Sequence, residues 1–155
     1  MLIRQARLSD ADAIARFNSQ MAMETEHLTL DPARLLEGVK AVLSDAAKGF
    51  YRVAEIDGRI AGQAMITFEW SDWRNANFWW LQSVYVDAEF RGRGVFSALY
   101  ESLVDEARKA GACGLRLYVE RENERAQRTY ARLGMRQADY RMYEVDFVLS
   151  RSEPA

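Results

Sequence analysis

The chain reads Phe90-Arg91-Gly92-Arg93-Gly94-Val95-Phe96 between a strand-like segment, Trp79 to Val86, and an amphipathic helix-like segment, Val95 to Ala110. Two glycines therefore stand where a helix begins, and glycine tolerates positive φ and close approach to the backbone. The first N–H groups of a helix lack intrahelical acceptors and, with the helix dipole, attract phosphate. The stretch predicts a diphosphate-binding loop, and a tight strand-to-helix turn without a ligand is the alternative.

Two common phosphate-binding patterns do not fit this loop. Gly94 is not followed by the Lys-Ser/Thr pair of the nucleotide P-loop. The dinucleotide pattern needs a third glycine, which is missing. The loop therefore belongs to neither of these nucleotide-binding classes.

Length and composition indicate one globular domain. The chain has 155 residues, of which 49% are hydrophobic, enough for one buried core and too few to favour two. We expect the domain to span residues 1–150 and a tail to span 151–155. The net charge of −2 argues against a nucleic-acid-binding protein, which usually carries a basic excess.

Cysteine and histidine content and hydropathy narrow the class further. Cys113 is the single cysteine and His27 the single histidine, so neither an internal disulfide nor a Cys/His zinc site is expected. The sequence has no apolar window long enough to span a bilayer, and its first residues lack the apolar core of a secretory signal. We expect a cytoplasmic protein without a metal and without a membrane partner.

Hydrophobic periodicity predicts strands separated by helices along the whole chain. The Asp31-Pro32 pair is a helix start signal, and Asp57-Gly58-Arg59 predicts a hairpin turn. A long strand, a helix and a further strand then predict a β-α-β unit with parallel strands. The predicted strands are Leu2–Arg7, Phe50–Ile56, Ile60–Phe68, Asn77–Val86, Gly114–Val119 and one or two within Arg136–Leu149; the predicted helices are Asp10–Met23, one beginning at Asp31-Pro32, Val95–Ala110 and Asn123–Leu133.

The predicted helix Asn123–Leu133 carries two polar side chains on its apolar face. At 100° per residue, Asn123 and Tyr130 share a face with Ala126 and Leu133. They are separated by about two turns, roughly 10 Å along the axis, so one extended ligand can touch both. The alternative is structural, because Asn is a good helix N-cap and Tyr is often a core residue with its hydroxyl satisfied.

The ordered set of motifs resembles the GNAT superfamily of acyl-CoA-dependent N-acyltransferases over nearly the whole chain. In the family's loop pattern, Arg/Gln-x-x-Gly-x-Gly/Ala, Arg91 and Gly94 match, whereas Phe96 occupies the final position. The resemblance implies a single GNAT-like α+β domain with a mixed sheet of six to seven strands, a splayed or bulged central strand and about four flanking helices. The motifs are Leu81-Gln82-Ser83-Val84-Tyr85-Val86, Arg91-Gly92-Arg93-Gly94-Val95, and Asn123, Ala126, Tyr130 and Leu133-Gly134-Met135.

The resemblance also implies acetyl-CoA as cosubstrate. Backbone N–H groups of the glycine loop would hold the diphosphate, and backbone groups of Val84 and Val86 would pair with the pantetheine arm like an added strand. The Val84 N–H would polarise the acetyl carbonyl, and Asn123 would hydrogen-bond the pantetheine or an ordered water. The implied cofactor-binding residues are Val84, Tyr85, Val86, Arg91, Gly92, Arg93, Gly94, Val95, Phe96 and Asn123.

Acyl transfer needs a stabilised oxyanion and a protonated leaving group. The resemblance puts the Tyr130 hydroxyl near the thioester sulfur, and a phenol with a pKa of about 10 can protonate a departing thiolate whose pKa is about 8.5. Val84 and Tyr130 are therefore the catalytic residues that we expect, Val84 as backbone donor and Tyr130 as general acid.

The sequence does not determine which residues bind and deprotonate the acceptor amine. A general base is required, and the sequence does not choose among Glu24, Glu26, His27, Glu69, Asp72 and Ser83 as a residue that positions water. Tryptophan rings and carboxylates can also receive a cationic amine. In a regular strand the adjacent Trp79 and Trp80 point to opposite faces, so at least one is expected in the core or an interface. The candidate substrate-binding residues are Glu24, Glu26, Glu69, Trp70, Trp73 and Ser83.

Together these features favour transfer of an acetyl group from acetyl-CoA to a primary amine of a small molecule. One alternative is acetylation of a protein or peptide amine in an open groove. Another is an acyl-CoA-binding sensor without turnover. The acceptor and the acyl-chain preference are not encoded in a recognisable pattern, and a homodimer is left open.

Overall fold

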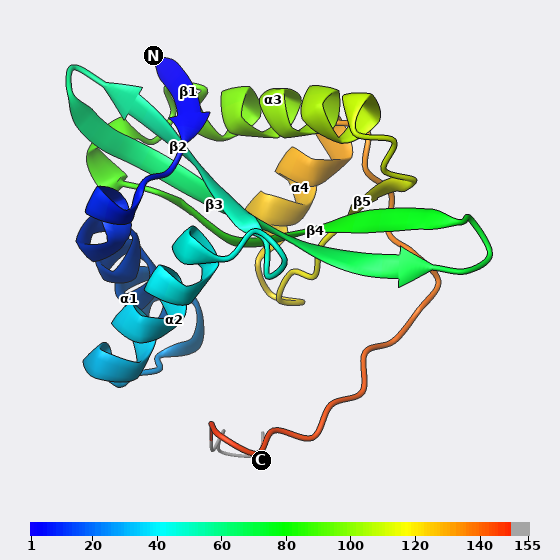
Figure 1. Cartoon of the computed structure of the whole chain (residues 1–155), viewed down its shortest axis with the longest axis horizontal. Coiled ribbons are helices and arrows are strands. Elements are labelled where there is room, and N and C mark those ends of the chain that lie inside the picture. The colour runs from blue at the N-terminus through cyan, green and yellow to red at the C-terminus, as the bar shows by residue number, and fades with distance from the viewer. Residues whose placement is uncertain (150–155) are drawn as a thin grey trace. The chain divides into compact units, whose positions relative to one another are not determined.

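The computed structural model describes residues 1–149, which form one β-sheet and four α-helices (Figure 1). The chain divides into two compact units, residues 1–122 and 123–155. The predicted α+β class is confirmed. In the first unit the elements are β1 (Leu2–Gln5), η1 (Leu8–Asp10), α1 (Ala11–Glu26), α2 (Pro32–Ser44), β2 (Phe50–Ile56), β3 (Arg59–Ser71), β4 (Ala76–Val86), η2 (Ala88–Phe90), α3 (Val95–Lys109) and β5 (Gly114–Arg116); the second unit contains α4 (Glu124–Arg132).

The sheet has the strand order β1-β2-β3-β4-β5. The first four strands pair in antiparallel fashion with their sequence neighbours, whereas β4 and β5 are parallel. Parallel neighbours need a crossover connection, and α3 supplies it. The predicted mixed sheet and the predicted β-α-β unit are confirmed.

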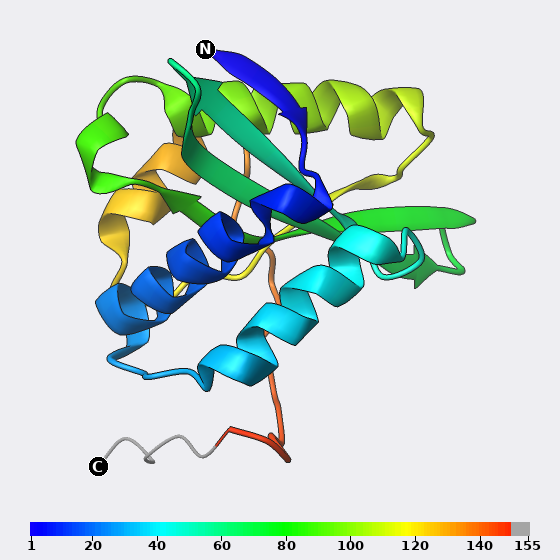
Figure 2. The same cartoon turned by 60° about the vertical axis from the view of Figure 1, so that its left-hand side comes forward.

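Helices cover both faces of this sheet, with α1 and α2 on one side and α3 on the other (Figure 2). Successive side chains of a strand point to opposite faces, and β2 shows this directly. Val53 belongs to the cluster with Ile14 of α1 and Val39 of α2. The next residue, Ala54, belongs to the cluster with Leu99 of α3. Two apolar layers therefore hold the sheet between its helices.

The local start signals act as the sequence predicts. The Asp31 carboxylate accepts hydrogen bonds from the N–H groups of Ala33 and Arg34 and so caps α2, with Pro32 in the first turn. Gly58, in the turn between β2 and β3, has φ +74°, which favours glycine. These local signals fix where α2 begins and where β2 turns into β3.

The predicted six to seven strands are wrong, because residues 1–149 contain five. The segment Arg136–Leu149 contains no strand, although its sequence is rich in β-forming residues. Tyr143 and Phe147 are about nine-tenths exposed there, at 89% and 90%. Strand propensity mainly reflects packing on a pleated, half-buried surface, so it is not realised without a partner strand. The predicted tail, 151–155, lies outside the described residues.

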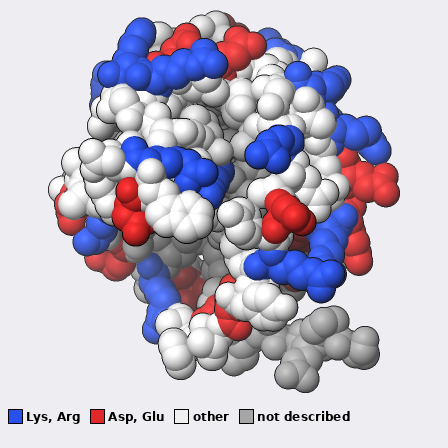
Figure 3. All heavy atoms as spheres, turned by 90° about the vertical axis from the view of Figure 1, so that its right-hand side faces the viewer, with Lys and Arg blue, Asp and Glu red and all other residues white. Residues whose placement is uncertain are grey.

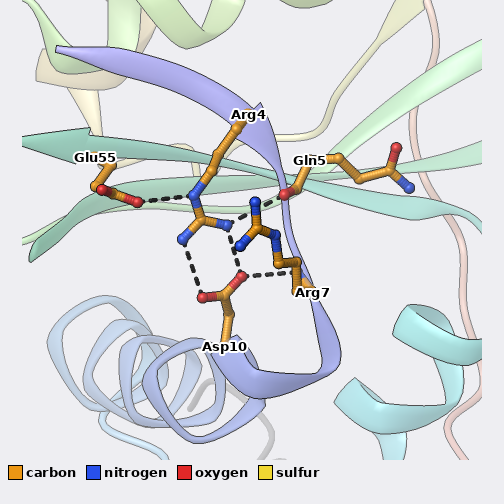
Figure 4. A network of polar contacts seen from close by, with 5 residues as sticks. All are labelled: Arg4, Gln5, Arg7, Asp10 and Glu55. Atoms are coloured by element: carbon orange, nitrogen blue, oxygen red, sulfur yellow. Dashed lines mark hydrogen bonds and ion pairs between the residues drawn. The ribbon is translucent and has the colours of Figure 1, made fainter. Parts of the chain in front are cut away.

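A polar network joins β1 to β2 and to the start of α1 (Figure 4). The Arg4 guanidinium donates to both carboxylate oxygens of Asp10, at 2.8 and 3.1 Å, and to Glu55 at 2.8 Å. Asp10 also accepts from the backbone N–H of Arg7 at 2.7 Å. The hydrogen bond from Arg4 outweighs burial and holds the pKa of Asp10 below its usual range.

Replacing Asp10 with asparagine is expected to lower the free energy of unfolding by about 2 kcal/mol at pH 7, because charge-assisted hydrogen bonds are lost. A depressed folded-state pKa contributes stability above the unfolded-state pKa, and this contribution disappears as the pH falls through the folded-state value. The difference between wild type and Asp10→Asn should therefore shrink below about pH 4. Denaturant unfolding across this range, with the exposed Asp12→Asn variant as control, measures it; an equal difference at all pH values would contradict it.

Candidate active site

A bulge interrupts β4 where the sequence motif contains Ser83 and Val84. Gln63 of β3 lies opposite Tyr85, whereas Met65 lies opposite Gln82, so the register shifts by one residue. Ser83 has φ +49°, a left-handed conformation that is uncommon for a residue other than glycine. Bulges of this kind redirect backbone groups and end regular pairing, and they are frequent beside active sites. The expected bulged strand is present.

The far edge of β4 becomes available for pairing just before the bulge. β5 pairs only with Phe78, Trp79 and Trp80, while β4 continues to Val86. No strand within residues 1–149 pairs with this edge beyond Trp80. An extended ligand can therefore add to the edge through backbone hydrogen bonds.

The glycine loop lies at the end of β4 and leads into α3. Gly92 and Gly94 both have φ +76°, and a Cβ added at either would meet no atom within 4 Å. Gly94 is the N-cap of α3 and brings no capping side chain, and the first helical hydrogen bond runs from the Ala98 N–H to the Gly94 carbonyl at 3.0 Å. Earlier N–H groups have no acceptor within the helix. The open space beside both glycines and the N–H groups without an acceptor in the helix fit a diphosphate.

The exposed Arg91 side chain is held by contacts with neighbouring elements. Its guanidinium donates to the Glu24 carboxylate at 2.8 Å and to the Val86 carbonyl at 3.0 Å, and it lies over the Tyr85 ring. The Tyr85 hydroxyl donates to the other oxygen of Glu24 at 2.7 Å. Glu24 at the end of α1 is thereby connected to both β4 and the glycine loop.

Two pKa values follow from this cluster. Burial would raise the pKa of Glu24, but the hydrogen bonds from Tyr85 and Arg91 outweigh it and hold the pKa below its usual range. Burial and the neighbouring Glu24 carboxylate raise the pKa of Tyr85 to about 12. Glu24 is a poor proton acceptor in this arrangement, because its ionised form is the one that is stabilised.

The other loop residues contact aromatic rings. The Phe96 ring is 6.1 Å from that of Tyr100, about one turn further along α3. Val95 and Leu99 form the buried face, whereas Phe96 is only half-buried. The Arg93 guanidinium lies over Phe90 at 5.3 Å. Phe96 therefore packs along the helix surface beside the loop, where the family pattern has Gly or Ala.

The β3–β4 hairpin carries the predicted tryptophans and Glu69. The Glu69 carboxylate accepts from Trp80 Nε1 and from Arg116, and these contacts, the Trp80 bond first, hold the pKa of Glu69 below its usual range. Trp70 and Trp73 are exposed, at 61% and 88%. Basic and acidic side chains are interspersed among uncharged ones on the face shown in Figure 3.

Trp79 points away from these residues into the core. It is buried, and its ring contacts those of Phe50 and Phe68. Its neighbour Trp80 instead contacts Tyr118. The prediction that at least one of the two adjacent tryptophans lies in the core or an interface is confirmed, because Trp79 lies in the core.

Asn123 and Tyr130 belong to the second unit. The Asn123 side chain accepts a hydrogen bond from the Ala126 N–H at 3.1 Å and so caps α4. Tyr130 lies within the same helix, about two turns from the cap. The capping role of Asn123 that the sequence allowed is confirmed.

Sequence reasoning missed a buried polar group behind the bulge. Gln63 is fully buried, and its amide donates to the Ser83 carbonyl and to Asn18 of α1. The sequence holds no signal for this contact, because Gln63 stands in a β-rich run as an ordinary polar residue. Glu26, also a candidate, lies at the last position of α1, and His27 ends the helix in a left-handed conformation.

Comparison with known proteins identifies the class to which this fold and loop belong. The model of the acetyltransferase (GNAT) family matches residues 14–135. Thialysine N-epsilon-acetyltransferase of Bos taurus is 30% identical over 144 residues, covering 86% of this chain and 83% of that protein. An uncharacterised N-acetyltransferase of Archaeoglobus fulgidus is 28% identical over 140 residues, covering 90% and 95%.

A solved structure agrees with these matches. A possible acetyltransferase from Clostridium difficile 630 has a TM-score of 0.88 and 47% sequence identity, covering 96% of this chain and 98% of that one. The chain belongs to the acetyltransferase (GNAT) family and is an acyltransferase. Enzymes of this family use acetyl-CoA as cosubstrate. Within residues 1–149, no helix has the length and apolar character needed to cross a membrane.

Proposed function

We propose that the protein transfers the acetyl group of acetyl-CoA to a primary amine of a small molecule. The observation that carries the proposal is the bulge at Ser83 and Val84 beside an edge of β4 that β5 leaves uncovered. A thioester arm lying along this edge would bring its carbonyl close to the bulge, with the diphosphate held at the glycine loop. Pantetheine pairing would use Val84, Tyr85 and Val86.

The proposed reaction is direct attack. The amine nitrogen forms a bond to the carbonyl carbon, and negative charge collects on the carbonyl oxygen, where the Val84 N–H donates a hydrogen bond. The carbon–sulfur bond then breaks, and the thiolate takes the Tyr130 hydroxyl proton. The attacking amine loses its proton to water or to a base, and water restores the Tyr130 proton. Asn123, whose side chain caps α4, would hold the arm directly or through water.

The acceptor is proposed to be a free amino acid or another small amine that is cationic at neutral pH. The name of the bovine relative, a thialysine N-epsilon-acetyltransferase, supports testing thialysine first. Glu26, Trp70 and Trp73 remain the proposed acceptor contacts, together with Ser83. Glu24 and Glu69 would act through the ionised carboxylates that their present partners stabilise.

Turnover with an amine panel tests this proposal. Purified protein is incubated with acetyl-CoA and thialysine, lysine, a polyamine or a peptide with a free N-terminus, and acetylated products are identified by mass. We expect product with at least one small amine and none without protein. Product from the peptide alone would favour acetylation of proteins. Acetyl-CoA binding without any product would favour a sensor, and both results would overturn the small-amine assignment.

A further inference from the structure

Four polar residues meet inside the layer between α1 and the sheet. Asn18 of α1, Tyr51 of β2 and Gln63 of β3 are buried, and all three lie on the side of the sheet that α1 covers. The Asn18 side chain donates to the Tyr51 hydroxyl at 3.2 Å, and the Gln63 side chain donates to Oδ1 of Asn18 at 2.7 Å. The fourth member is Ser83 of β4, whose side chain is hydrogen-bonded to Tyr51 and whose carbonyl accepts from Gln63 at 3.2 Å.

The backbone determines the orientation of the Gln63 amide. The Ser83 carbonyl can only accept a hydrogen bond, so the Gln63 nitrogen must face it. The same nitrogen donates to Oδ1 of Asn18, so both N–H groups of the Gln63 amide are used. The side-chain oxygen of Gln63, Oε1, therefore faces away from the Ser83 carbonyl. It is buried without a hydrogen-bond partner among the described residues. An unsatisfied buried acceptor is unfavourable, so this amide is not explained by core packing alone.

The bulge explains what the amide does. Ser83 and Val84 together stand against a single residue of β3, and the extra residue leaves part of the ladder unpaired. Ser83 is half-buried, and its backbone carbonyl takes its hydrogen bond from the Gln63 side chain. The left-handed conformation of Ser83 is also unfavourable for a residue with a Cβ, so it must be held by its surroundings.

We infer that Gln63 is a positioning residue that holds the β4 bulge in the register at which the Val84 N–H can serve the acetyl carbonyl. The inference rests on the proposed function for the role of Val84, but its structural part, control of the bulge by a side chain of β3, stands separately. Gln63 acts through Ser83 and Val84, and contact with substrate is not part of its role.

A purely structural role predicts a different outcome. If Gln63 only filled the core, an apolar side chain of similar length would be tolerated, and any lost stability would leave kcat unchanged. If Gln63 holds the bulge, replacing it leaves the Ser83 carbonyl without its hydrogen-bond donor. Ser83 and Val84 can then return toward regular pairing with β3. The N–H that stabilises the oxyanion would then be misdirected, which lowers kcat more than it changes acetyl-CoA binding.

The test compares Gln63→Met, which removes both N–H donors and keeps the side-chain length, with Ile66→Ala, which destabilises the same strand at another buried position. We expect kcat to fall by about 10- to 100-fold in Gln63→Met, against the 10²–10³-fold typical of losing an oxyanion donor. The acetyl-CoA affinity should change much less. Ile66→Ala should lose stability and keep its kcat. Tyr51→Phe removes only one hydroxyl from the network, so it should also lower kcat, but by less than Gln63→Met does.

A second measurement does not depend on catalysis. Backbone NMR shifts and amide hydrogen exchange at Ser83, Val84 and Tyr85 report the bulge directly. We expect them to change in Gln63→Met and to stay close to wild type in Ile66→Ala. Changed signals together with a wild type that acetylates no amine would uphold the structural part and reject the proposed function. Unchanged signals at these residues, or full kcat in Gln63→Met, would overturn the inference.

Discussion

Replacing Tyr130 with phenylalanine is expected to lower kcat by about 10²- to 10⁴-fold, the usual cost of removing a positioned general acid. The variant keeps the aromatic ring and loses only the hydroxyl that would protonate the departing thiolate. Acetyl-CoA affinity should therefore remain close to that of wild type. Steady-state kinetics with an accepted amine and calorimetric titration with acetyl-CoA measure the two quantities separately.

The exposed Tyr140, which belongs to the same unit as Tyr130, provides a matched control. Tyr140→Phe removes the same atom and should keep full kcat. An acetyl donor with a more acidic thiol should also reduce the deficit of Tyr130→Phe, because its leaving group needs less help from a proton donor. Full turnover in Tyr130→Phe would show that another group, or solvent, protonates the thiolate.

Replacing Gly94 with glutamate is expected to abolish measurable acetyl-CoA binding. The new side chain has room, since no atom lies within 4 Å of the position of its Cβ, but the φ of +76° makes any Cβ unfavourable. A carboxylate at the start of α3 would also occupy the N–H groups proposed for the diphosphate and repel its charge. Like charges placed together cost several kcal/mol, so the affinity should fall by at least about 10²-fold.

Gly58→Glu is the matched control for this variant. Gly58 has φ +74°, also has no atom within 4 Å of an added Cβ, and lies in the β2–β3 turn. The backbone strain and the added charge are therefore alike, whereas the site differs. Calorimetric titration should show binding in Gly58→Glu and none in Gly94→Glu. Equal binding by both variants would mean that the diphosphate does not lie at the glycine loop.

Local patterns predicted most of the elements that frame the site. The apolar spacing of Leu99, Leu103 and Ala107 predicts α3, and its buried face contains all three. The Asp31-Pro32 pair marks the start of α2. The prediction of strands within Arg136–Leu149 is wrong, because β-rich composition favours a strand but does not supply the partner strand that pairing requires.

Sequence patterns do not predict the contacts that connect the elements of the site. Glu24 and Arg91 are 67 residues apart, and Gln63 lies 45 residues from Asn18. Nothing in the periodicity of α1 or β3 pairs such residues, because periodicity reports which face a side chain occupies and not which residue it meets. The ionisation of Glu24 follows from the same long-range contacts, so its weak basicity could not be anticipated either.

The sequence by itself determined the α+β class, the parallel β4–β5 pair and the glycine loop at the start of α3, because backbone preference, hydrophobic period and glycine position are local properties. Only the tertiary structure decided that the sheet has five strands within residues 1–149, that Arg91 is held by Glu24, and that a buried glutamine supports the β4 bulge. These features depend on hydrogen bonds between distant segments, which form only when the core brings those segments together.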